Sequence, residues 1–130
     1  MRLQEPLQAL NQPAATTVNA AYRGHSQFGP GLLETVYHTC LAYELTKEGI
    51  SIAQQMIFPI HYDGLQLDAG FRINLWLEGG VIAELKAEEA LLPLHHAQLL
   101  TYLKLPENRL GLLINFNVLW IRDGIKRVVL

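Results

Sequence analysis

Residues 81–87, Val-Ile-Ala-Glu-Leu-Lys-Ala, place a carboxylate and an ammonium group near the end of an otherwise apolar run. The apolar residues predict a buried strand, in which side chains two positions apart point to the same face. Glu84 and Lys86 are therefore expected to project side by side. Charged groups at such a position are costly unless they are paired, hydrogen-bonded or bound to a metal ion. The pattern favours a sheet whose inner strand opens onto a polar site.

The preceding segment, residues 71–77, alternates between apolar and more polar side chains and predicts a second strand. One face is expected to carry Ile73, Leu75 and Leu77, and the other Arg72, Asn74 and Trp76. The turn at residues 78–80, Glu-Gly-Gly, predicts an antiparallel hairpin between the two strands. Asn74 is then expected to face the same site as Glu84.

Composition favours a single folded domain. Half of the 130 residues are hydrophobic and 17% are charged, so a buried core is expected and disorder is not. The net charge of −2 gives no bulk attraction for nucleic acid, so phosphate binding would need a local patch. The single cysteine, Cys40, allows no internal disulfide and fits a cytoplasmic location. No signal peptide and no membrane span are expected.

The order of elements indicates an α/β fold with a mixed central sheet flanked by helices. Residues 1–12 are expected to be loosely ordered and residues 13–130 to form one domain, with a first helix that begins at Pro13. A second helix is expected over about 32–48 and a third over about 93–105. The remaining strands are expected at 50–62, 65–67 and 110–116, with a last hairpin of 119–121 and 125–129.

Two of these helices carry further polar candidates. In the third, His95, Gln98 and Tyr102 lie on one stripe, which would direct Gln98 toward the charged pair. In the second, Glu34 follows a break at residues 29–31 and falls in the first helical turn. The helix dipole favours a carboxylate there without any further role, so both readings of Glu34 stay open.

Other polar groups are better explained by structure. His95 and His96 point in different directions on a helix, and no Cys or His stands at a zinc-like spacing from them. The basic cluster near the carboxyl end favours a solvated edge over a phosphate contact. Trp76 and Trp120 are expected to be packing anchors, with stacking on a base as the alternative for an exposed ring.

Several motifs, in order, resemble the GxxExxY family. They are Gly29-Pro30-Gly31-Leu32-Leu33-Glu34-Thr35-Val36-Tyr37, Gln55, Glu84-Leu85-Lys86, Pro93, His95, Ala97-Gln98-Leu99-Leu100, Tyr102-Leu103-Lys104-Leu105, Gly111-Leu112-Leu113-Ile114-Asn115-Phe116 and Gly124-Ile125-Lys126-Arg127-Val128. The resemblance covers roughly residues 18–129. The family is placed in the PD-(D/E)XK nuclease-like superfamily.

The resemblance implies a restriction-endonuclease-like core with helices on both sides of a mixed sheet. It also implies a site made of Glu84 and Lys86 on one strand, an Asp on the strand before, Gln98 on the following helix and Glu34 on the early helix. Asn74 stands where the family has that Asp. Asn keeps a carbonyl ligand but loses a negative charge, so weaker Mg²⁺ binding is expected.

Two functions follow from these residues. The first is a nuclease that uses Mg²⁺ or Mn²⁺, with metal held by Glu84, Glu34 and Asn74, water assisted by Lys86 and the site ordered by Gln98. Its activity would be weakened or lost because of Asn74.

The second is a noncatalytic module that binds nucleic acid or a protein on the same fold. DNA or RNA is the expected partner, and self-association stays open. A third reading is that Glu84 and Lys86 simply pair with each other. The nuclease reading requires the side chains of residues 34, 74, 84, 86 and 98 to meet in one pocket open to solvent.

Overall fold

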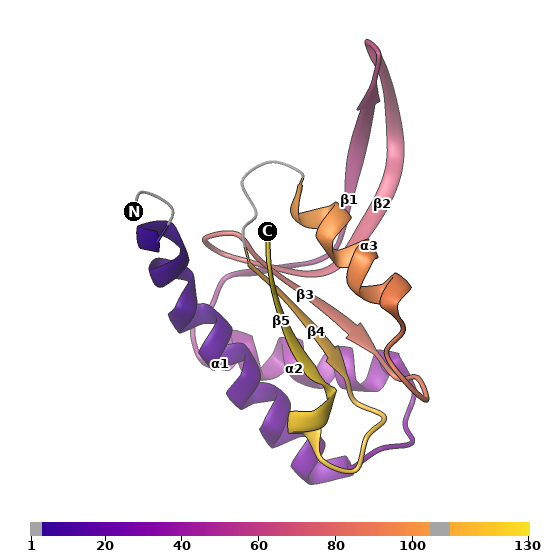
Figure 1. Cartoon of the computed structure of the whole chain (residues 1–130). Helices are drawn as coiled ribbons and strands as arrows, with labels where there is room; N and C mark the ends of the chain where they lie inside the picture. The colour runs from indigo at the N-terminus through magenta and orange to yellow at the C-terminus, as the bar shows by residue number, and fades with distance from the viewer. Residues whose placement is uncertain (1–3, 105–109) are drawn as a thin grey trace.

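The structure, a computed structural model, describes residues 4–104 and 110–130 (Figure 1). Its elements are α1 (Gln4–Phe28), α2 (Glu34–Lys47), β1 (Ile52–Tyr62), β2 (Leu65–Leu77), β3 (Val81–Lys86), α3 (Pro93–Leu103), β4 (Leu110–Asn115), the 3₁₀ turn η1 (Ile121–Gly124) and β5 (Ile125–Val129). The strands form one sheet in the order β1-β2-β3-β4-β5. β3 and β4 are parallel, and the other neighbours are antiparallel. The predicted α/β fold with a mixed sheet is confirmed.

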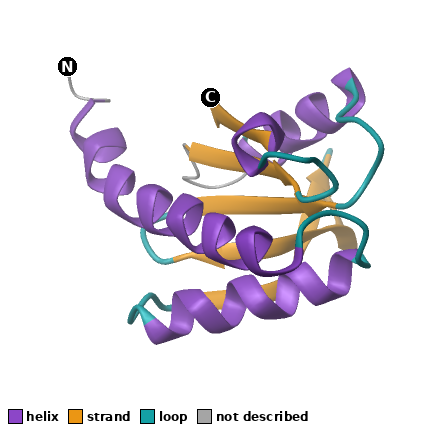
Figure 2. Ribbon diagram, turned by 90° about the horizontal axis from the view of Figure 1, so that it is seen from below, coloured by secondary structure: helices purple, strands orange, loops and turns teal. Residues whose placement is uncertain are grey.

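Helices cover both faces of the sheet. Figure 2 shows α1 and α2 side by side on one face and α3 on the other. Two buried clusters fill the space between the sheet and the helices, because the inner strands β3 and β4 are apolar on both faces. Tyr37 and Leu41 pack in the first cluster, while Leu99 and Leu103 pack in the second. No helix in the described ranges has both the length and the apolar character of a membrane span.

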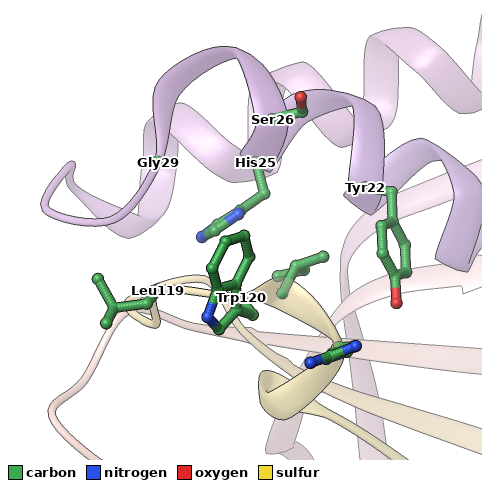
Figure 3. A pocket seen from close by; sticks show the side chains of 8 residues that line it. Tyr22, His25, Ser26, Gly29, Leu119 and Trp120 are labelled. Carbon is green, nitrogen blue, oxygen red and sulfur yellow. The ribbon is translucent and has the colours of Figure 1, made fainter.

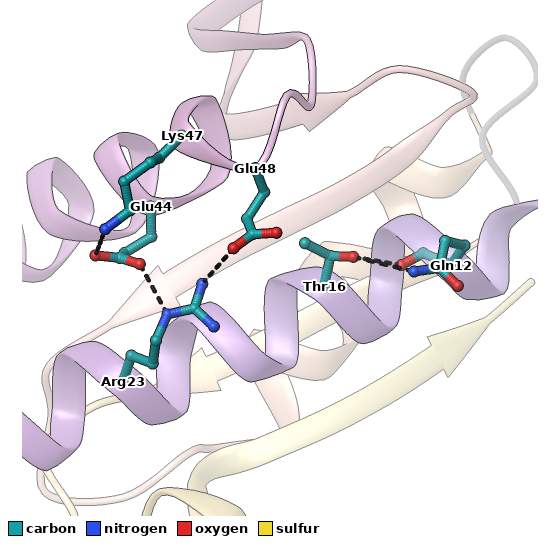
Figure 4. A network of polar contacts seen from close by, with 6 residues as sticks. All are labelled: Gln12, Thr16, Arg23, Glu44, Lys47 and Glu48. Carbon is teal, nitrogen blue, oxygen red and sulfur yellow. Dashed lines mark hydrogen bonds and ion pairs between the residues drawn. The ribbon is translucent and has the colours of Figure 1, made fainter.

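A surface network joins α1 to α2 (Figure 4). Arg23 donates to Glu44 at 2.8 Å and lies 3.6 Å from Glu48, and Lys47 contacts Glu44 at 3.4 Å. The Arg23 hydrogen bond is the main cause of a lowered Glu44 pKa. Exposed pairs of this kind contribute little to stability, so the network orients the two helices more than it holds them.

The predicted start of the first helix at Pro13 is wrong. α1 begins at Gln4 and contains Pro13 in its interior. A proline removes only one intrahelical N–H, and buried residues just after it, Ala14 and Thr17, anchor this part of the helix. Before it, Asn11 accepts a hydrogen bond from Arg127 of β5. α1 thus passes residue 12 without a break, and the division of the chain into a 1–12 segment and a 13–130 domain stays a prediction.

The predicted last hairpin, 119–121 with 125–129, is also wrong. Residues 121–124 form η1, and β5 pairs with β4 instead. Gly124 lies so close to the end of β4 that a Cβ there would meet the Asn115 carbonyl oxygen at 2.1 Å. The Asp-Gly signal therefore marks a tight approach to β4 and not a hairpin turn. The predicted end of the third helix near residue 105 lies outside the described residues.

β1 and β2 form an arm that projects beyond the rest of the sheet (Figure 1). β2 is one strand of 13 residues, where two separate strands were predicted. Its ladder with β3 ends at the pair Leu75–Ala83, so the outer part of β2 pairs only with β1. The arm turns at Asp63-Gly64, as predicted, with positive φ at both residues.

The arm also changes the face that its side chains present. Residues two apart in a regular strand share a face, yet Ile73 packs in the α3 cluster and Leu75 in the α1–α2 cluster. β1 changes face in the same way, because Ile52 packs in the α1–α2 cluster and Met56 in the α3 cluster. The prediction of one shared face for Ile73, Leu75 and Leu77 is therefore wrong. The side chains of β2 therefore change from one face of the sheet to the other at Asn74.

Candidate active site

A pocket of about 660 Å³ lies where the start of α2, the strands β1 to β3 and α3 come together. Its lining residues are Glu34, Thr35, Gln55, Arg72, Asn74, Glu84, Lys86, Gln98 and Tyr102. All five residues that the sequence predicted for the site are among them. Gln55, Arg72 and Gln98 are exposed, so the pocket opens to solvent. The spatial convergence on which the sequence analysis depended is present, while the roles of the residues stay predictions.

Asn74 and Glu84 replace the backbone ladder at the point where β2 leaves β3. The Asn74 backbone N–H donates to Glu84 Oε1 at 2.9 Å, and the Leu85 N–H donates to Asn74 Oδ1 at 2.8 Å. These reciprocal bonds satisfy backbone groups that the strand separation would otherwise leave without a partner. They also fix both side chains at the floor of the pocket.

Glu84 is a buried carboxyl group with 6% of its surface exposed. The pKa of Glu84 is raised to about 7, mainly by burial and also by the nearby charge of Glu34, while the Asn74 N–H and Lys86 act in the opposite direction. The effect of Glu34 means that the two carboxylates repel each other electrostatically. A buried acid near a second acid favours a bound cation in this pocket.

Lys86 follows Glu84 on the same face of β3 and is partly buried. The two side chains form no direct ion pair among the described residues. The charge of Lys86 lowers the Glu84 pKa, so the two groups interact without a direct contact. Lys86 leaves its ammonium available to an anion in the pocket.

α3 supplies the opposite wall. Gln98 lies exposed at the pocket, and Tyr102 is buried, with its pKa raised by burial and by the charge of Glu84. The Tyr102 ring stacks on Phe71 at 4.5 Å, which ties α3 to the arm. His95, on the same predicted stripe, does not line this pocket, and its Nδ1 accepts the Leu92 N–H at 3.0 Å. His95 therefore caps the start of α3.

Glu34 reaches the pocket from the loop before α2, which is held by Asn117, whose Oδ1 accepts the Gly31 N–H at 3.1 Å, and by Tyr37. The Tyr37 hydroxyl donates to the Gly29 carbonyl at 2.6 Å and accepts the Leu32 N–H at 3.1 Å. Gly29 and Gly31 take positive φ in this loop. The spacing Gly-x-x-Glu-x-x-Tyr thus combines a turn, a pocket carboxylate and the side chain that holds the turn.

Arg72, Gln55, Thr35 and Tyr102 line the pocket but were not predicted as site residues. Arg72 had a usable signal, because the sequence places it on the same face as Asn74. Gln55 had only its position in the resemblance. Arg72 adds an exposed cation that suits a phosphate at the rim.

The donor set fits a hydrated divalent cation of the Mg²⁺ type. Glu84 and Glu34 provide carboxylates, and Asn74 provides a neutral oxygen. Mg²⁺ commonly takes one or two carboxylates and completes its shell with water and phosphate oxygens. Within the described ranges no three His, Cys, Asp or Glu side chains form a metal-ligating group. The protein would therefore supply few of the ligands itself.

A second pocket, of about 730 Å³, lies between the end of α1 and η1 (Figure 3). His25 in its wall bonds through Nε2 to the Val118 carbonyl oxygen at 2.7 Å. Trp120 is 65% exposed, so the prediction that it is a packing anchor is wrong. None of the described residues that line this pocket is a carboxylate, so its lining differs from that of the candidate active site.

A sequence profile of the PD-(D/E)XK nuclease superfamily matches residues 11–128. No curated protein matches the chain, and no solved structure does.

Proposed function

The chain belongs to the PD-(D/E)XK nuclease superfamily, and from this premise we propose that its pocket hydrolyses phosphodiester bonds of DNA or RNA with Mg²⁺ or Mn²⁺. We place the chain in the GxxExxY family within that superfamily. The observation that carries the proposal is the meeting of two carboxylates, Lys86 and Gln98 around one solvent-open pocket. Asn74 lowers the rate of this reaction.

Each side chain has a role that follows from its chemistry. Glu84, Glu34 and Asn74 would hold the cation, which supplies Lewis-acid activation of the phosphodiester when bound. Lys86 neutralises charge that develops on the phosphate and orients the attacking water. Gln98 orders that water from α3, and Arg72 binds a neighbouring phosphate at the rim.

Glu84 makes cation binding depend on pH. Its raised pKa of about 7 means that the free carboxyl group carries a proton for part of the time at neutrality. Glu84 would hold a cation in its unprotonated form, so we expect affinity to increase as the pH rises through 7.

Asn74 is the reason for a reduced rate. Its Oδ1 already accepts the Leu85 N–H, so only one lone pair of a neutral oxygen is left for a cation. An Asp at this position would accept the same N–H with one oxygen and offer the second to the cation. The same observation favours a second candidate function, in which the pocket binds nucleic acid without cleaving it.

Asn74→Asp tests the two functions against each other. We expect this variant to bind Mn²⁺ at least ten-fold more tightly by calorimetry and to cleave single- or double-stranded DNA or RNA faster than the wild type. Lys86→Ala in the same background should remove cleavage and keep Mn²⁺ binding. Nucleic-acid binding without cleavage in every variant would support the second function. Absence of both binding and cleavage would exclude the two.

A further inference from the structure

Gln55 lies at the point where the arm turns over. In the β1–β2 register, Gln54 pairs with Leu75 and Met56 with Ile73, so Gln55 stands across from Asn74. Gln55 has φ of 51°, in the left-handed region that residues with a side chain rarely adopt. This backbone conformation reverses the face that β1 presents, as the packing of Ile52 and Met56 requires. An unfavourable conformation at a pocket wall indicates a constraint imposed by the surroundings.

His38 of α2 supplies that constraint. Its Nε2–H donates to Gln54 Oε1 at 3.0 Å, and its Nδ1 accepts from Gln55 Nε2 at 3.5 Å. Consecutive side chains of a regular strand point to opposite faces and cannot reach one imidazole. The left-handed backbone of Gln55 brings both carboxamides to the same side. His38 is 9% exposed and lies one helical turn after Glu34, so it is held beside the pocket.

The two bonds of His38 also orient the Gln55 carboxamide. Because Nε2 of Gln55 is directed to the imidazole, the carbonyl oxygen Oε1 is the end left for the pocket, which Gln55 lines. No donor in residues 4–104 and 110–130 is bonded to this oxygen. A carbonyl oxygen accepts hydrogen bonds, so it can bind the water molecules around a cation, because these donate. It cannot bind a phosphate oxygen in this way, because both groups are acceptors.

We propose that Gln55 contacts the water shell of a divalent cation in this pocket and that His38 is its positioning residue. The inference rests on the proposed function, because it requires a cation between Glu84 and Glu34. It assigns to the arm a direct part in the site, in addition to Asn74.

Mn²⁺ titration by calorimetry tests the contact with Gln55. We expect Gln55→Leu to lower Mn²⁺ affinity about ten-fold, and Gln55→Glu, which adds a negative acceptor, to raise it. Equal affinity in the wild type and Gln55→Leu would overturn the inference and leave the proposed function intact. Absence of Mn²⁺ binding in both the wild type and Asn74→Asp would overturn the two together.

Substitution of His38 tests the positioning role. His38→Leu should lower Mn²⁺ affinity as much as Gln55→Leu does. His38→Asn keeps an acceptor near the position of Nδ1 and should restore most of the loss. The same low affinity in both His38 variants would show that His38 does not act through Gln55.

Glycine substitution separates backbone cost from ligand contact. Gln55→Gly should raise the Tm, because glycine adopts positive φ without a Cβ penalty, and it should lower Mn²⁺ affinity. Asp63→Gly is the matched control, since Asp63 has φ of 50° at the tip of the arm, outside the pocket. It should leave Mn²⁺ affinity unchanged. A Gln55→Gly protein that binds Mn²⁺ like the wild type contradicts the inference.

Discussion

The two walls that face Glu34 are built differently. The β3 wall is a regular strand in which Glu84 and Lys86 follow the ordinary two-residue period between buried apolar residues. The arm wall, with Asn74 and Gln55, lies where β2 leaves β3 and where the ribbon turns over. The two charges of the β3 wall thus come from regular structure, whereas the neutral polar contacts of Asn74 and Gln55 come from irregular structure. The β3 wall depends on burial, whereas the arm wall depends on a few specific bonds.

The largest expected effect concerns the β3 wall and pH. The pKa of Glu84 is raised from 4.5 to about 7, so the folded state favours the protonated carboxyl group. The contribution of protonated Glu84 to the free energy of unfolding is fully present below pH 4.5 and is lost as the pH rises through 7. In metal-free buffer, the wild type should lose about 3 kcal/mol of unfolding free energy between pH 4.5 and pH 8 relative to Glu84→Gln.

Denaturant titrations at several pH values measure this difference. Glu89→Gln, at an exposed position, is the control and should follow the wild type. Parallel curves for the wild type and Glu84→Gln would mean that Glu84 is not strained by burial, and the contrast between the walls would disappear.

The next effect concerns the packing that holds the arm to α3. Phe71 stacks on Phe58 at 5.5 Å and on Tyr102 at 4.5 Å, so it is the central ring of three. Phe71→Ala should lower the unfolding free energy by about 2 kcal/mol, below the value for a fully buried ring because Phe71 is half-buried. Hydrogen exchange should then increase in the β1 and β2 amides and not in β3. Equal increases in both walls would show that they are one cooperative unit.

Asn74→Ala tests the specific bonds of the arm wall. The change removes the acceptor of the Leu85 N–H, and we expect a loss of about 1 kcal/mol. Asn74→Asp keeps the acceptor and should cost less in metal-free buffer at pH 5. Thermal denaturation of the two variants measures the difference. A smaller loss for Ala than for Asp at this pH would exclude the hydrogen bond as the stabilising term.

The smallest effect on stability is expected at the rim. Arg72 is exposed, so Arg72→Gln should change the unfolding free energy by less than about 0.5 kcal/mol. If Arg72 contacts one phosphate, the slope of log affinity for nucleic acid against log salt should fall by about 1. Fluorescence anisotropy at several salt concentrations measures that slope. An unchanged slope would remove Arg72 from the interface.

The site residues of the β3 wall could be predicted from the sequence, because strand periodicity and burial determine their positions. Glu84 and Lys86 could be placed from the alternation of a single strand, and Gln98 from helical spacing. Asn74 of the arm wall could also be placed, from the alternation of residues 71–77, although that alternation conceals the change of face at this residue. Gln55 could not be placed in this way, because no residue type marks its left-handed backbone. Helix α1 and η1 were misplaced because Pro13 and Gly124 act through tertiary packing that local signals do not contain.

The position of β1 at the edge of the sheet has a consequence for self-association. Its outer side offers backbone donors and acceptors over 11 residues, which is a template for a strand from another molecule. Pro59 has no N–H, and the pairing with β2 is irregular between Phe58 and Ile60, so this template is interrupted near its middle. Replacement of Pro59 would therefore lengthen the continuous edge and make the protein more prone to aggregate.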